Sequence, residues 1–148
     1  MSAQLCKINL GIVGAAGRGG SFKGACDAIN DVHIHAVCDI DEEGLLSAAI
    51  RLGASEKYLR YEEMLEKSDI DAVIIGTPMP YHVPQAIAAL NKDIHVLSEV
   101  PAGISFKQCK DLVEAVKRSS ATYMMAENTP YMRSNQIVSE PRRLSASL

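Results

Sequence analysis

Residues 8–20 read INLGIVGAAGRGG, and in them an apolar run of strand length, Ile8 to Val13, passes directly into a cluster of glycines. The dinucleotide fingerprint G-x-G-x-x-G has this arrangement, because the strand must turn tightly into a helix while its backbone approaches a pyrophosphate. Gly14 and Gly19 fill the outer positions of the pattern, and Ala16 fills the middle one. The segment predicts a phosphate-binding turn at the N-terminus of a helix over residues 22–29.

Three residues decide how well this turn would hold a phosphate. Ala16 adds one methyl group where the fingerprint has glycine, and Gly17 next to it can take over part of the close backbone approach. Arg18 has two readings that the sequence leaves open: its guanidinium covers a phosphate, or water solvates it.

Beyond the turn, apolar runs of strand length alternate with amphipathic runs of helix length, which predicts a doubly wound α/β domain with a parallel, Rossmann-type sheet. The predicted strands are 8–13, 33–38, 57–59, 72–75, 94–97 and 122–125. The predicted helices carry the apolar stripes Phe22-Ala25-Cys26-Ile29, Leu45-Ala49-Leu52, Val83-Ala86-Ile87-Leu90 and Cys109-Leu112-Val113-Val116, with a short helix over 62–67. Gly53 is expected to end the second helix, and Ser105 with Gln108 to cap the last.

Asp39 follows the second predicted strand, 20 residues after Gly19. An acidic residue at this distance accepts hydrogen bonds from the ribose hydroxyls of NAD, and its charge repels the 2′-phosphate of NADP. NAD is therefore the expected cofactor, with NADP less favoured. The alternative is that Asp39 is only a helix N-cap, a task for which Asp41 competes.

Length and composition fit one globular domain without a nucleic-acid or membrane partner. The chain has 148 residues, 47% hydrophobic and 22% charged, with a formal net charge of −3. Residues 72–91 carry no charged side chain, but Gly76 and three prolines interrupt them, so a strand, a turn and a helix are expected rather than a membrane span. We expect a domain over 1–133 and an irregular or truncated tail over 134–148.

The cysteines and histidines predict no metal site. The four cysteines, Cys6, Cys26, Cys38 and Cys109, form no C-x-x-C pair and are expected to be reduced core thiols of a cytoplasmic protein. His33 and His35 share a strand, but no acidic or thiolate residue has matching spacing, so they are expected to be ordinary strand side chains.

Four segments together resemble the glucose–fructose oxidoreductase and inositol dehydrogenase family (Gfo/Idh/MocA). They are GIVGAAGRG at 11–19, VCDID at 37–41, DAVIIGTP at 71–78 followed by His82, and VLSEVP at 96–101. The resemblance implies an N-terminal NAD(P)-binding Rossmann domain. It also implies hydride transfer to or from a hydroxyl-bearing carbon of a sugar, cyclitol or similar small molecule.

The resemblance also implies roles for individual residues. Gly14, Ala16, Gly19 and Asp39 match the cofactor turn and the ribose carboxylate, Thr77 and Pro78 a loop along the cofactor, and Glu99 the acid near the nicotinamide ribose. Pro101 matches the turn behind that acid, and Asn128 a polar residue near nicotinamide and substrate. His82 is expected either to contact cofactor or substrate or to be a polar residue at a helix start.

Two departures from the family leave the catalytic residues unknown. Val100 stands where the family has a lysine that commonly contacts the substrate, and a valine has no proton to transfer. The family's C-terminal substrate domain is expected to be absent after about Arg133. General acid–base catalysis would then come from that domain, from His82 as a weak candidate, or from water.

Two other functions stay open beside a dehydrogenase. One is redox-neutral glycoside cleavage with a tightly held NAD, and the other is a truncated nucleotide-binding module without activity of its own. Asn128 and Tyr131 line a binding cleft or lie at an edge that packs on the missing domain. The last predicted strand would expose apolar surface there, so a homo-oligomer is possible.

Overall fold

The structure, a computed structural model, describes residues 7–128. The predicted tail over 134–148, as well as Cys6, Tyr131 and Arg133, lies outside this range. The elements in chain order are β1 (Ile8–Val13), η1 (Arg18–Phe22), α1 (Lys23–Asp27), β2 (Val32–Cys38), α2 (Glu42–Leu52), β3 (Glu56–Tyr58), α3 (Tyr61–Lys67), β4 (Ala72–Ile75), η2 (Met79–Tyr81), α4 (His82–Leu90), β5 (His95–Ser98), α5 (Phe106–Arg118) and β6 (Tyr123–Met125).

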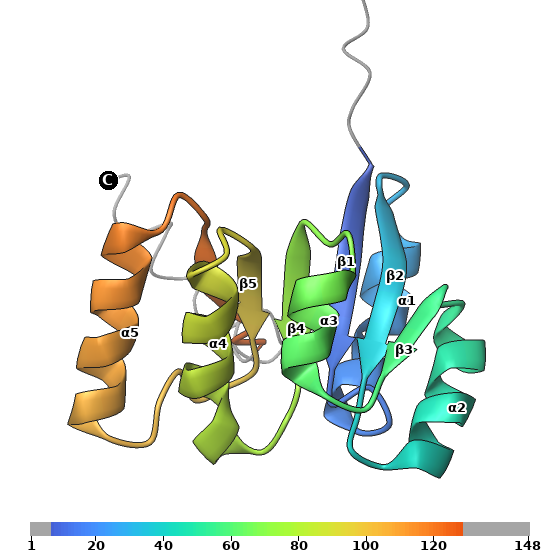
Figure 1. The fold of residues 1–148 in the computed structure, drawn as a ribbon, viewed down its shortest axis with the longest axis horizontal. Helices are drawn as coiled ribbons and strands as arrows, with labels where there is room; N and C mark the ends of the chain where they lie inside the picture. The colour runs from blue at the N-terminus through green and yellow to red at the C-terminus, as the bar shows by residue number, and fades with distance from the viewer. Residues whose placement is uncertain (1–6, 129–148) are drawn as a thin grey trace, which may run out of the picture.

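The strands form one parallel sheet in the order β3-β2-β1-β4-β5-β6 (Figure 1). After β3 the chain crosses to the other side of β1 and continues outward through β4, β5 and β6. This reversal confirms the predicted doubly wound fold. It also creates a switch point between β1 and β4, where the chain leaves the two carboxyl ends in opposite directions and a crevice opens.

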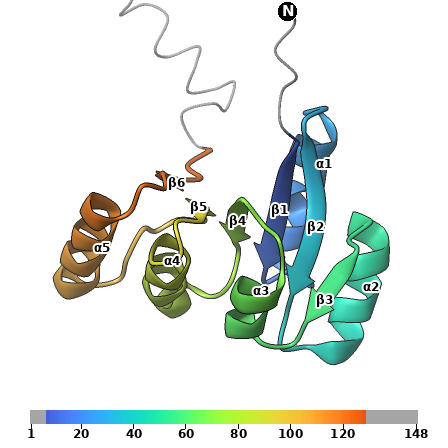
Figure 2. The same ribbon diagram turned by 45° about the horizontal axis from the view of Figure 1, so that its top comes forward.

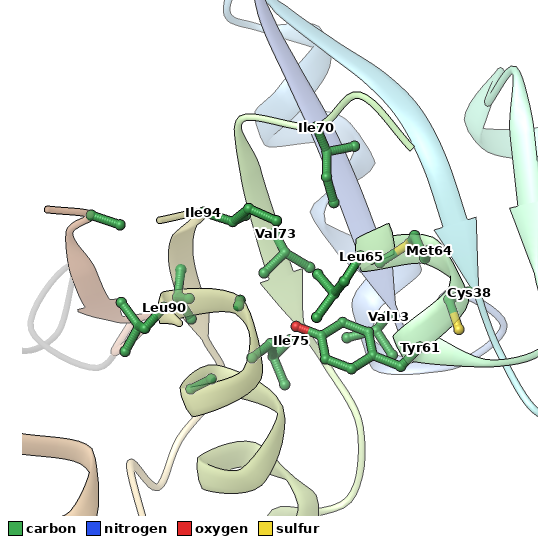
Figure 3. Close-up of a cluster of buried hydrophobic side chains, with 14 of the residues drawn as sticks. Val13, Cys38, Tyr61, Met64, Leu65, Ile70, Val73, Ile75, Leu90 and Ile94 are labelled. Carbon is green, nitrogen blue, oxygen red and sulfur yellow. The ribbon is translucent and has the colours of Figure 1, made fainter. Parts of the chain in front are cut away.

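Helices cover the sheet in two layers (Figures 1 and 2). α3, α4 and α5 pack on one face, and the cluster beneath them includes Tyr61, Met64, Val73 and Leu90 (Figure 3). α1 and α2 cover the other face, over a cluster that includes Ile12, Ile74 and Leu45. Burying both faces requires apolar residues on both sides of each central strand, which explains the continuous apolar runs of β1 and β4.

A register irregularity in β2 changes which face its side chains occupy. Leu10 pairs with Ile34 and Gly11 pairs with Ala36, so His35 is skipped in the pairing with β1. As a result Ile34 and Ala36, two positions apart, belong to different core clusters instead of sharing one face. The sequence pattern gave no sign of this bulge.

The first helix differs from the predicted one. A 3-10 turn occupies Arg18–Phe22, and α1 covers only Lys23–Asp27, so the stripe expected over 22–29 does not form. Cys26 is buried, whereas Ala25 is exposed and Ile29 lies beyond the helix end with 53% of its surface exposed. The reason is the close packing of Gly19 against Gly76, the residue after β4. Arg18–Phe22 form a 3-10 turn there, so fewer residues are left for the α-helix.

The buried residues of α5 differ in part from the predicted apolar stripe of this helix. Leu112 and Ala115 are its buried residues, whereas Cys109 and Val113 are exposed, so the expectation of a core thiol is wrong for Cys109. Cys26 and Cys38 are buried as predicted.

Both predicted helix ends are confirmed. Ser105 Oγ accepts the Gln108 N–H at 3.2 Å, while the Gln108 carbonyl oxygen Oε1 accepts the N–H of Ile104 rather than that of Ser105. Gly53 follows α2 with φ +70°. Within residues 7–128, no helix is both long enough and apolar enough to cross a membrane.

Candidate functional site

Two adjoining pockets lie at the carboxyl ends of the parallel strands. The larger, of about 880 Å³, runs from the end of β2 across the glycine turn to the loop after β4. The smaller, of about 500 Å³, continues from that loop to the segment after β5. Arg18, Thr77 and Pro78 line both pockets, so the two form one crevice over the switch point of the sheet.

The glycines of the first turn divide two tasks between them. Gly14 has φ +76°, and a Cβ there would lie 2.6 Å from the carbonyl oxygen of Gly76. Gly19 is buried, and a Cβ there would lie within 3.0 Å of the carbonyl oxygens of Val13 and Gly14. Gly14 therefore makes the tight turn. Gly19 packs the turn against the sheet and itself lines neither pocket. Ala16 and Gly17 line the larger pocket, and a Cβ at Gly17 would come no closer than 3.9 Å to its nearest neighbour, the carbonyl oxygen of Gly14.

Asp39 lines the larger pocket and holds the turn in place. Its Oδ2 accepts the backbone N–H of Ala16 at 2.9 Å, and its Oδ1 accepts that of Asp41 at 3.1 Å. The N-cap residue of α2 is Asp41, so Asp39 is not the cap. A carboxylate has about four lone-pair sites, so Asp39 keeps acceptor capacity for hydroxyl groups in the pocket.

The larger pocket includes residues that the sequence analysis missed. Tyr61, Tyr81 and Gln85 line it, and the Tyr61 hydroxyl donates to the Gln85 carbonyl oxygen at 3.0 Å. The Thr77 hydroxyl donates to Gln85 Oε1 at 2.6 Å, which fixes the amide and leaves its N–H groups as donors. The four-residue spacing of Tyr81 and Gln85 after the Thr77–Pro78 loop could have indicated that both face the same pocket.

Cys38, at the end of β2, also lines the larger pocket. Burial, and to a lesser extent the negative charges of Asp39 and Glu62, raise the pKa of its thiol to about 12. At neutral pH Cys38 is therefore an uncharged thiol, so it does not repel a phosphate there.

Arg18 forms an ion pair across the crevice with Glu99, the residue after β5. Its Nε and Nη2 both lie 2.6 Å from Glu99 Oε1, and Glu99 Oε2 accepts the N–H of Val100 at 3.2 Å. The Arg18 side chain is half-exposed and Glu99 is buried. The guanidinium thus pairs with a carboxylate in the smaller pocket while half of the side chain stays exposed, and the contact of Arg18 with a phosphate stays a prediction.

His82 is buried between the loop after β4 and the loop after β5. Its Nε2 lies 2.7 Å from the carbonyl oxygen of Thr77, and its Nδ1 lies 3.0 Å from that of Pro101. A neutral imidazole carries one N–H and can donate to only one of these oxygens, whereas an imidazolium donates to both. The ring contributes to the wall of the smaller pocket and connects the two loops that line it.

Three other predicted positions differ in how close they lie to the crevice. Val100 lines the smaller pocket. Pro101, which follows a cis peptide bond, and Asn128, which is exposed, line neither pocket. His33 and His35 lie with their ring centroids 6.0 Å apart, and no group of three or more possible metal ligands occurs within residues 7–128.

A sequence model of the GFO_IDH_MocA group, described as "Oxidoreductase family, NAD-binding Rossmann fold", matches residues 8–127. Among curated proteins, a glycosyl hydrolase family 109 protein of Shewanella woodyi is 32% identical over 93% of this chain. The chain spans only 32% of the length of that relative.

Solved structures share the fold. The WlbA dehydrogenase of Bordetella pertussis, in complex with NADH and UDP-GlcNAcA, superposes with a TM-score of 0.86 and 26% identity, covering 97% of this chain and 41% of that one. The scyllo-inositol dehydrogenase of Lactobacillus casei, with bound NAD(H) and scyllo-inositol, gives a TM-score of 0.85 at 23% identity, covering 95% and 42%. The fold of residues 7–128 is therefore shared with dehydrogenases whose structures hold NADH or NAD(H).

Proposed function

Because this chain belongs to the Gfo/Idh/MocA oxidoreductase family, whose Rossmann domain binds NAD, we propose a role for its crevice and for the whole protein. Residues 7–128 bind NAD(H) across the carboxyl edge of the sheet. The whole protein uses the cofactor to transfer a hydride to or from a hydroxyl-bearing carbon of a sugar, a cyclitol or a similar small molecule. When bound, the nicotinamide supplies the redox chemistry, and the protein supplies binding and orientation.

The position of Asp39 and the hydrogen bonds of its carboxylate are the observation that carries this proposal. Asp39 directly follows β2 and lines the larger pocket beside the glycine turn, and its carboxylate retains acceptor capacity toward the pocket. This arrangement suits the two hydroxyls of an adenosine ribose and disfavours a 2′-phosphate, so NAD(H) is preferred over NADP(H).

The rest of the crevice fits a dinucleotide that extends from the end of β2, past the ends of β1 and β4, to the end of β5. Gly17 leaves room for phosphate oxygens, and Arg18 provides a cation next to the turn. Thr77 and Pro78 connect the two pockets, and Glu99 lies at the far end. These residues would bind and orient the cofactor, and Val100 leaves proton transfer to other groups.

Calorimetric titration of the chain with NADH and NADPH tests the proposal. The expected result is saturable binding of NADH and weaker binding of NADPH. Asp39→Asn removes the charge but keeps one acceptor oxygen, so it should narrow or abolish the preference between the two nucleotides. Absence of binding by either nucleotide, or an unchanged preference in Asp39→Asn, would contradict it.

A second reaction class has its own support. The curated relative named above is a glycosyl hydrolase, and in redox-neutral cleavage the nicotinamide would be reduced and reoxidised within one turnover. The two classes differ in what accumulates. A dehydrogenase produces NADH in proportion to substrate consumed, whereas the glycosidase releases sugar with no net change in absorbance at the NADH band.

A nucleotide-binding module without activity of its own is the third candidate function. Binding of NADH combined with absence of both NADH formation and glycoside cleavage, across inositols and N-acetylated sugars, would support it.

A further inference from the structure

The proposed function uses Arg18 and Glu99 one by one, as residues that line the crevice, and gives no role to the ion pair between them. We propose that this pair sets the relative affinity of the crevice for oxidised and reduced cofactor, by keeping the net charge at the nicotinamide end close to zero. The inference rests on the proposed function, since it requires NAD(H) in the crevice.

The order of the strands places the pair at the nicotinamide end. Asp39 follows β2, the glycine turn follows β1, Thr77 follows β4 and Glu99 follows β5, and these strands are neighbours in that order. A dinucleotide with its adenosine ribose at Asp39 and its pyrophosphate at the glycine turn must extend away from β2. The space that continues in this direction is the smaller pocket, which the pair lines.

The walls of the smaller pocket make a single charge important. Apart from Arg18 and Glu99, its lining side chains are uncharged or, in the case of His82, held between two backbone carbonyls. The remaining residues are Thr77, Pro78, Met79, Pro80, Val100 and Ile104. Because few other charges line this pocket, one uncompensated charge changes the electrostatic potential at the nicotinamide end.

Both charges are held in place. Glu99 is buried and accepts hydrogen bonds from the Arg18 guanidinium and from the Val100 N–H. Arg18 belongs to the packed 3-10 turn, and its guanidinium carbon lies 5.7 Å from the centroid of the Phe22 ring. The two opposite charges therefore cancel at a defined place instead of being spread over mobile side chains.

The oxidised nicotinamide carries one positive charge that the reduced ring lacks, which fixes the sign of each substitution. Glu99→Gln leaves the guanidinium unbalanced and should weaken NAD⁺ binding relative to NADH. Arg18→Met leaves the carboxylate unbalanced and should strengthen NAD⁺ binding relative to NADH. The double variant removes both charges, so its ratio of dissociation constants should return close to that of the unaltered chain.

Calorimetric titrations with NAD⁺, NADH and ADP-ribose at pH 8 measure these effects. Each single variant should shift the ratio of the NAD⁺ and NADH dissociation constants by about fivefold or more, in opposite directions. For a two-electron couple, a tenfold shift of this ratio corresponds to about 30 mV in the potential of the bound cofactor. ADP-ribose, which lacks nicotinamide, reports whether the rest of the crevice stays intact in each variant.

Glu66→Gln and Arg118→Met are the matched controls, because both residues are exposed and line neither pocket, and the two substitutions change the net charge by the same amounts. In both control variants the ratio of the NAD⁺ and NADH dissociation constants should match that of the unaltered chain. A loss of affinity that is equal for NAD⁺ and NADH would show that the pair only supports the structure, and shifts of the same sign in both single variants would also overturn the inference. If the unaltered chain binds none of the three ligands, the proposed function itself is wrong, and the inference fails with it.

Discussion

The carboxylate of Asp39 accepts the backbone N–H of Ala16 at 2.9 Å, which joins the end of β2 to the middle of the glycine turn. Ala16 is the residue that departs from the glycine fingerprint, and its N–H is the one that Asp39 holds. The same carboxylate also faces the larger pocket. Asp39 therefore has a structural task in addition to the ribose contact proposed for it.

Asp39→Ala should lower the free energy of unfolding by about 1–3 kcal/mol, because the N–H groups of Ala16 and Asp41 both lose their side-chain acceptor. Asp39→Asn should lose less, because it keeps one acceptor oxygen. Urea denaturation monitored by circular dichroism measures both values. Asp69→Ala, at an exposed position, is the control and should stay within about 0.5 kcal/mol of the unaltered chain. Equal stability of Asp39→Ala and Asp69→Ala would contradict the structural task.

His82→Ala should lower the free energy of unfolding by about 2–4 kcal/mol, since it empties a buried site and removes the ring that lies within hydrogen-bond distance of the carbonyl oxygens of Thr77 and Pro101. His82→Gln can still donate one hydrogen bond, so we expect an intermediate loss. The same urea titration tests both variants against His33→Ala, whose side chain is exposed. A loss in His82→Ala no larger than in His33→Ala would show that the two loops do not depend on this ring.

Two glycines close together in sequence should respond to alanine in opposite ways. At Gly19 an added Cβ would lie 2.8 Å from the Val13 carbonyl oxygen and 2.9 Å from that of Gly14. Both are backbone atoms, so Gly19→Ala should lose about 1–3 kcal/mol of stability. At Gly24, inside α1, a Cβ would meet nothing within 4 Å. Gly24→Ala should therefore gain up to about 1 kcal/mol. Melting temperatures that move in the same direction for both variants would contradict this reading.

Periodicity predicted most of the architecture because the core is built from elements that bury a regular face. The strand Ile8–Val13 and the strand Ala72–Ile75 agree with the sequence pattern to the residue. The helix predicted after the glycine turn failed, since close packing of Gly19 on Gly76 depends on a strand far away in sequence. Such tertiary contacts override local periodicity, and a single sequence does not display them.

In the candidate site, too, some features were predictable from the sequence and others were not. Gly14, Ala16 and Asp39 were predictable because one fingerprint with fixed spacing includes all three. The partnership of Arg18 with Glu99 was not, because 81 residues separate them and only the order of the strands brings them together. The two carbonyl contacts of His82 were likewise hidden, since they involve backbone atoms, which every residue type shares.

Cys38 and Cys109 should differ in reactivity toward iodoacetamide at pH 8. Cys109 is exposed, whereas Cys38 is buried and burial raises the pKa of its thiol to about 12. We expect rapid alkylation of Cys109 and protection of Cys38 until the chain unfolds, as read by peptide mass spectrometry. Comparable labelling rates for the two thiols in the folded chain would contradict the burial of Cys38.

The same thiol makes stability depend on pH in the alkaline range. The unfolded thiol loses its proton near its ordinary pKa of 9.0, while the folded thiol keeps it until about 12. The folded chain then binds more protons, so the free energy of unfolding should fall as pH rises from about 9 toward 12. Urea titrations at pH 7.5, 9 and 10.5 measure the slope. In Cys38→Ala the slope should be smaller, although the variant is less stable at every pH; an unchanged slope would exclude this thiol as a cause.

Arg51 supports the glycine turn from behind. It lies in the last turn of α2, and its Nη1 and Nη2 donate to the carbonyl oxygens of Gly20 and Ala15 at 3.1 and 3.2 Å. Arg51 lines neither pocket, so any effect on cofactor binding must act through the position of the turn.

Substitutions at Arg51 can separate this support from its effect on the helix. Arg51→Lys keeps a positive charge at the C-terminal end of α2, which preserves the favourable interaction with the helix dipole, but its single nitrogen cannot reproduce the two-pronged contact. We therefore expect Arg51→Lys to retain most of the stability and to bind NADH about threefold to fivefold more weakly. Arg51→Met should lose both stability and affinity for NADH, because methionine has neither the positive charge nor the hydrogen-bond donors of arginine. Arg118→Met, which removes an exposed arginine from the end of α5, is the control for the change in net charge. Unaltered NADH affinity in both Arg51 variants would show that the turn keeps its shape without this side chain.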